Sequence, residues 1–146
     1  MRSFKFSIIL LFLIGHAVSA QVELKWKDFA DVKFEPVYNP TYDVNFLMPT
    51  FGSWISSFEG KEVQIKGFFL DISGNGEIYL VSAKPMASCF FCGAAGPETI
   101  IEVDFKDKPP FRTDQVIMAT GVLELNPDNV DRCNYILKEA SGQLIN

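Results

Sequence analysis

Apolar and polar residues alternate along much of the chain after residue 61, which is the period expected of β-strands. Val63 and Ile65 alternate with Gln64 and Lys66, and an apolar run then continues to residue 70. Runs of this kind predict five strands, at residues 62–70, 78–81, 99–105, 115–125 and 135–140. Turn-forming residues separate these runs, so the second half of the chain is predicted to be a β-domain.

Two features of these strands favour a small barrel. Residues 73–76, Ser-Gly-Asn-Gly, have the composition of a hairpin turn between the first two strands. Gly67 and Gly121 lie inside the first and fourth strands, where a missing side chain allows sharp coiling. The fold class predicted is therefore all-β in the main, a small five-stranded OB-fold-like barrel. A β-sandwich is the alternative.

A short helix is expected before the first strand. Apolar residues recur with the spacing of one helix face at Phe51, Trp54, Ile55 and Phe58. Pro49 suits the start of this helix and Gly60 suits its end. Earlier in the chain, Trp26 and Phe29 suggest one helical turn, and residues 32–42, with two prolines, indicate extended chain lying across the domain.

The N-terminus has the pattern of a secretory signal. Arg2 and Lys5 precede an apolar stretch at residues 8–14, and Val18-Ser19-Ala20 offers small residues for a signal peptidase. We expect cleavage before Gln21, a periplasmic or secreted protein, and no stable membrane insertion after cleavage. The predicted organisation is a signal peptide at 1–20, an N-terminal extended segment at 21–48 and the OB-like barrel domain at 49–146.

Charge narrows the range of partners. The chain has 13 Lys and Arg against 18 Asp and Glu, a net charge of −5. Removal of residues 1–20 would take away Arg2, Lys5 and the only histidine, His16, and would make the chain more acidic. An acidic protein repels phosphate backbones, so a nucleic-acid partner is not expected. Without a histidine in the mature chain, Ser/His, Cys/His and histidine-zinc catalysis are excluded.

Three cysteines carry the candidate chemistry. Cys89 and Cys92 form a Cys-x-x-Cys-Gly sequence, and Cys133 lies between the fourth and fifth strands. If consecutive strands alternate in direction, the connections at 82–98 and 126–134 lie at the same end of the barrel. The topology therefore predicts that the three cysteines can meet.

Three interpretations of this set stay open, besides the simpler one that the cysteines are reduced thiols packed in the core. As a metal site, Cys89, Cys92 and Cys133 would bind zinc or copper; the thioether of Met86 would favour Cu(I), and a nearby carboxylate Zn²⁺. As a redox pair, Cys89 and Cys92 would alternate between thiols and a disulfide. This interpretation is less favoured, because no helix N-terminus is predicted there to lower a thiol pKa. As a structural disulfide, Cys92 with Cys133 would stabilise the fold by about 4 kcal/mol.

The sequence also resembles a family of small exported bacterial proteins known as a domain of unknown function. The resemblance lies in Gly60–Phe68 (GKEVQIKGF), Tyr79–Val81, the cysteine-bearing loop and Ile101–Val103. It covers residues 26–143 and implies an envelope protein that serves a metal or transport system.

The loop departs from the pattern of that family, which has a cysteine, a histidine two places later and a run of prolines. Cys89 matches the cysteine, but Phe91 stands at the histidine position, Cys92 is additional, and Gly93–Pro97 replaces most of the prolines. A thiolate thus stands one residue beyond the expected imidazole, which is compatible with a ligand role.

Two functions follow from these observations. The first is an exported envelope protein that binds a soft metal ion through three cysteines at one end of a small β-barrel. The alternative is a non-catalytic protein- or peptide-binding module of an envelope or transport system, in which the cysteines form a structural disulfide. No residue set typical of an enzyme is found beside the cysteine pair. Asp128, Asn129 and Asp131 lack the glycine and terminal glutamate of a calcium loop and indicate a turn.

Overall fold

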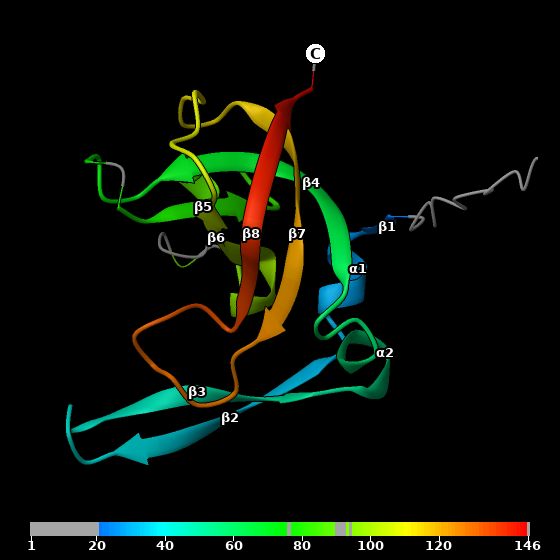
Figure 1. The fold of residues 1–146 in the computed structure, drawn as a ribbon. Coiled ribbons are helices and arrows are strands. Elements are labelled where there is room, and N and C mark those ends of the chain that lie inside the picture. The colour runs from blue at the N-terminus through cyan, green and yellow to red at the C-terminus, as the bar shows by residue number, and fades with distance from the viewer. Residues whose placement is uncertain (1–20, 76, 90–92, 94, 146) are drawn as a thin grey trace, which may run out of the picture.

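The computed structural model describes residues 21–75, 77–89, 93 and 95–145. Among these residues, five strands close into a barrel. The barrel strands are β4 (Glu62–Asp71), β5 (Tyr79–Ser82), β6 (Ile100–Phe105), β7 (Val116–Leu125) and β8 (Tyr135–Leu144). The barrel closes through the pairing of β4 with β7, and Figure 1 shows how these strands curve around the core. The prediction of a mainly β, OB-like barrel is confirmed, and each predicted strand corresponds to one of these five.

The order of the strands explains how the barrel closes. The neighbours run β4-β5-β6-β8-β7, and β4 also pairs with β7. All these pairs are antiparallel except β6 with β8, which is parallel. Because β6 and β8 run in the same direction, the connections that lead into them lie at the same end of the barrel. The prediction from strand parity is therefore confirmed for these two connections.

Alternation along the strands places one apolar face inside. On β4, Val63, Ile65 and Phe69 are buried, whereas Lys66 between them is exposed. Ile117 and Leu123 are buried in the same core from β7. Burial of a side chain of this size stabilises the fold by about 1.5–3 kcal/mol, so these positions account for much of the barrel's stability.

Two glycines lie where the barrel leaves no room for a side chain. A Cβ at Gly67 would lie 2.6 Å from the Ser82 carbonyl oxygen and 2.9 Å from the Trp26 ring. A Cβ at Gly121 would lie 2.7 Å from the Lys138 carbonyl oxygen, at a register shift between β7 and β8. The expectation that both glycines serve sharp coiling of the barrel agrees with these close approaches.

The segment before the hairpin seals one side of the barrel. Strand β1 (Val22–Leu24) pairs in parallel with β4, and helix α1 (Trp26–Phe29) follows it. The Trp26 indole donates a hydrogen bond of 2.8 Å to the Lys66 carbonyl oxygen. The Tyr135 hydroxyl, from β8, donates one of 2.7 Å to the Phe29 carbonyl oxygen. The helical turn predicted at Trp26 and Phe29 is confirmed.

Residues 32–51 form a β-hairpin rather than a strap of extended chain. Strands β2 (Val32–Asn39) and β3 (Val44–Phe51) pair with each other, and the described residues provide neither with a second strand neighbour. The hairpin lies across the end of the barrel beside the connection after β7 (Figure 1). Sequence alternation does not reveal it, because most of its side chains are exposed on both faces.

The hairpin includes two prolines in paired positions. Pro36 lies opposite Leu47, and Pro49 lies opposite Phe34. A proline has no N–H to donate, so it fits a regular antiparallel ladder only at a non-hydrogen-bonded pair. The backbone groups of such a pair point away from the partner strand, so each proline faces an outer edge of the hairpin.

The helix predicted after Pro49 begins later than expected. Pro49 and Phe51 belong to β3, and helix α2 spans Ser53–Ser56. The side chain of Asp31 fixes this start, because its Oδ2 atom accepts hydrogen bonds from the backbone N–H groups of Trp54 and Ile55. The sequence pattern could not reveal this distant cap. None of the helices in the described residues has the length and apolar character needed to cross a membrane.

Candidate functional site

A pocket of about 470 Å³ lies between the hairpin and the end of the barrel. One wall consists of Phe46, Leu47 and Met48 from β3. Leu80 of β5 and Ile100 of β6 belong to the barrel side of the pocket. The connection after β7, residues 127–134, forms the remaining wall. The pocket is therefore built by four segments of the chain, from β3, β5, β6 and the connection after β7.

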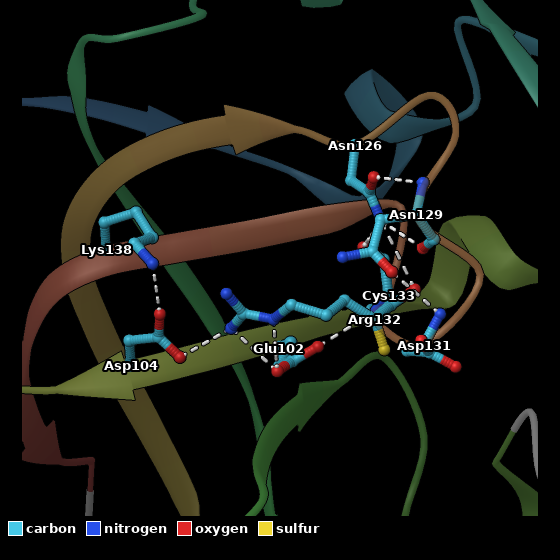
Figure 2. A network of polar contacts seen from close by, with 8 residues as sticks. All are labelled: Glu102, Asp104, Asn126, Asn129, Asp131, Arg132, Cys133 and Lys138. Atoms are coloured by element: carbon cyan, nitrogen blue, oxygen red, sulfur yellow. Dashed lines mark hydrogen bonds and ion pairs between the residues drawn. The ribbon is translucent and has the colours of Figure 1, made fainter.

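Asn126 organises the connection between β7 and β8. Its side chain is almost completely buried, at 6% exposure. Its Nδ2 atom donates hydrogen bonds to the carbonyl oxygens of Asn129 (2.7 Å) and Cys133 (3.1 Å), and its Oδ1 atom accepts one from the Asn129 N–H (2.9 Å). Figure 2 shows this amide beside the backbone of the loop. One side chain thus binds the loop at both Asn129 and Cys133. The turn predicted at 128–131 lies within this loop.

An ion-pair network supports the same loop from the barrel side (Figure 2). The Arg132 guanidinium lies 2.7 Å from Glu102 Oε1 and 2.7 Å from Asp104 Oδ1. Lys138 Nζ lies 2.6 Å from Asp104 Oδ2. Glu102 also accepts a hydrogen bond of 2.9 Å from the Cys133 N–H. Strand β6 therefore anchors the loop through Arg132 and Cys133, and Lys138 of β8 holds Asp104 from its other side.

The charges within this network are matched. Hydrogen bonding to Glu102 raises the pKa of Arg132 above its usual value. Burial alone would raise the pKa of Asp104, but hydrogen bonds from Lys138 and Arg132 outweigh burial, and the pKa of Asp104 is lowered. Two cations thus face two carboxylates, and the network leaves no net charge for a ligand.

The far end of the hairpin contacts the loop directly. The Tyr42 hydroxyl, at the hairpin turn, donates a hydrogen bond of 3.0 Å to Asp131 Oδ1. The Tyr42 ring meets Phe46 edge to face, with centroids 5.6 Å apart. The hydrogen bond to Asp131 raises the pKa of Tyr42, so the phenol remains a neutral donor at physiological pH. This contact joins the hairpin turn to the loop that lines the pocket.

Three of the four predicted sulfur ligands, Met86, Cys89 and Cys133, lie in one apolar cluster beside this pocket. Cys89 is fully buried and packs with Leu70 and Leu80, and the partly buried Met86 and Cys133 pack against the same cluster. Cys133 also lines the pocket. Cys89 and Cys133 are free cysteines. Cys92, the remaining predicted ligand, lies outside the described residues, as do Phe91 and the predicted signal peptide at 1–20.

The environment of Cys133 favours a protonated thiol. Burial, with a further contribution from the Glu102 carboxylate, raises the pKa of Cys133 to about 12. A thiol rather than a thiolate is therefore present at neutral pH, and a thiol is a weak nucleophile. Within the described part of the chain, no three His, Cys, Asp or Glu side chains are grouped closely enough to hold a metal ion.

Several pocket residues were not among the sequence candidates. The β3 wall was missed because the hairpin itself was missed. Glu102 and Arg132 were missed because their contact depends on how the loop folds back on β6. Asn126 is the residue that the sequence could have indicated, since an asparagine before Pro127 is typical of a turn.

Comparison of the chain with protein-family models, curated proteins and solved structures finds no match.

Proposed function

We propose that this protein is a non-catalytic binding module that accepts an apolar side chain of a peptide segment into the pocket between β3 and the barrel. The observation that carries the proposal is the pocket itself, about 470 Å³ in volume and walled by apolar side chains of the hairpin and the barrel. This volume is within the range of about 300–1,000 Å³ common for ligand sites.

The chemistry of the walls supports binding rather than catalysis. The Glu102 carboxylate and the Arg132 guanidinium are engaged with each other, and the Cys133 thiol is protonated at neutral pH. Neither the Glu102–Arg132 salt bridge nor the Cys133 thiol is free to act on a substrate. The rigid loop and the apolar walls instead suit recognition of a side chain.

The biological setting is also a proposal. The N-terminal sequence supports export to the periplasm or outside the cell, and the resemblance of Gly60–Phe68 supports membership of the exported domain-of-unknown-function family. In that setting, a protein of an envelope or transport system would supply the peptide segment.

The pocket can be tested with two hydrophobic hairpin residues of equal exposure. Leu47 is 51% exposed and lines the pocket, whereas Val37 is 50% exposed and does not. A panel of blocked peptides containing Leu or Phe should shift NMR signals of β3 and of residues 127–134. Leu47→Asp should weaken this binding at least about tenfold, since it replaces an apolar contact by a charge, and Val37→Asp should leave it unchanged. Equal effects of the two variants would contradict the proposal.

A second function, binding of a soft metal ion, has its own supporting observation. Met86, Cys89 and Cys133 belong to one apolar cluster, and Cys92 follows Cys89 by three positions in the sequence. Thiolates and thioethers favour Cu(I), and thiolates also bind zinc. Because metal binding must displace the Cys133 proton, affinity should rise with pH. Metal stoichiometry of the reduced protein under anaerobic conditions tests this second proposal.

A further inference from the structure

The rim of the pocket carries carboxylates that no described residue neutralises. The Asp and Glu residues that line the pocket are Glu102, Asp128 and Asp131. Glu102 is paired with Arg132. Neither Asp128 nor Asp131 forms a salt bridge with another described residue. The pocket therefore combines apolar walls with two unpaired negative charges.

Both carboxylates are held at the rim by the loop. Asp131 is exposed, and its N–H donates a hydrogen bond of 3.0 Å to Asn129 Oδ1. Its carboxylate accepts a hydrogen bond from the neutral Tyr42 hydroxyl. Asp128 is exposed between Pro127 and Asn129. Because Asn126 binds the backbone of Asn129, this part of the loop has a fixed shape before any ligand arrives.

We propose that the pocket recognises a peptide segment in which an apolar residue is next to a lysine or arginine. This inference rests on the proposed function and adds the charge of the partner. The apolar side chain would occupy the space between Leu47 and Leu80, and the cation would pair with Asp131 and Asp128. Charge complementarity of this kind selects the partner more than it adds affinity. An acidic segment would instead meet two uncompensated carboxylates.

The test compares lysine with its neutral analogue. Blocked peptides containing Leu or Phe beside lysine are matched by peptides with Nε-acetyllysine, which keeps the aliphatic stem but removes the charge. Binding is measured by fluorescence anisotropy at low and at high salt. We expect the lysine peptides to bind about fivefold more tightly at low salt, and this preference to shrink at high salt, because exposed ion pairs are weak and screened.

Paired variants assign the preference to the rim. Asp128→Asn with Asp131→Asn should remove the lysine preference, so that the lysine and acetyllysine peptides bind this variant equally. Glu35→Gln with Asp107→Asn makes the same change in net charge at two exposed positions outside the pocket. This control should keep the preference.

The outcomes separate the two proposals. Equal binding of both peptide types, sensitive to Leu47→Asp, would overturn the inference and leave the binding module standing. Loss of the lysine preference in the Glu35 and Asp107 control would also overturn it, because bulk charge would then explain the effect. Absence of any binding sensitive to Leu47→Asp would refute the proposed function and the inference together.

Discussion

Replacement of Asn126 by alanine should destabilise the protein by about 3 kcal/mol. The side chain makes three well-formed hydrogen bonds, two to carbonyl oxygens and one from the Asn129 N–H, at 2.7–3.1 Å. Each such bond contributes about 1 kcal/mol net. Water cannot easily replace the amide, because Asn126 is only 6% exposed. The expected loss is a large fraction of the 5–15 kcal/mol typical of a domain.

Urea unfolding followed by circular dichroism measures this loss. The midpoint should fall while the slope of free energy against urea stays constant, since the surface exposed on unfolding is the same. Asn126→Asp retains the acceptor for Asn129 but turns a carboxylate toward carbonyl oxygens, so it should be at least as destabilising.

Asn45→Ala provides the control for the same chemical change. Asn45 is exposed on β3, and its side chain has no hydrogen bond within the described residues. Its replacement should change stability by less than about 0.5 kcal/mol. If Asn126→Ala and Asn45→Ala unfold at the same urea concentration, Asn126 does not hold the loop and the pocket wall is not preformed.

Two further predictions concern the sulfur atoms. If a metal is bound, replacement of Cys89, Cys92 or Cys133 by serine should in each case weaken metal binding strongly, and Met86→Leu should weaken the binding of Cu(I) but hardly affect that of zinc. A metal stoichiometry near zero in anaerobic, reduced protein would refute this. If the cysteines only form a disulfide, two of the three serine substitutions should lower stability and the third should not. The pKa of Cys133 is raised from 9.0 to about 12, so the contribution of its neutral thiol is present below pH 9 and is lost as the pH rises toward 12. The free energy of unfolding should therefore decline over that range, and Cys133→Ala should make the decline smaller; an identical decline in both proteins would contradict the prediction.

The barrel could be predicted from the sequence because its signal is local. Val63 and Ile65 face the core from alternate positions of one strand, and Gly67 marks the close approach of Trp26. Strand parity then placed the connections into β6 and β8 at one end, which is why Cys89 and Cys133 share a cluster.

The pocket could not be predicted, because its walls depend on tertiary contacts. The β2–β3 hairpin buries too little of either face to leave an alternating pattern, and the prolines at residues 32–42 indicated extended chain without a paired strand. Asp104 pairs with Arg132 and Lys138, and both contacts depend on the register of β6 against the loop and β8. Contacts of this kind leave no periodic trace in a sequence.

The prolines of the hairpin bear on the solubility of the protein. An isolated two-stranded sheet with exposed Val37, Tyr38 and Leu47 would normally be a template for strand addition by another copy of the chain. Pro36 and Pro49 each remove one outward-facing N–H, one from each edge of the hairpin. The two edges are therefore poor starting points for aggregation, while the apolar side chains on the faces stay available. The hairpin can thus bind an apolar side chain of a partner without pairing its strands with another copy of the chain.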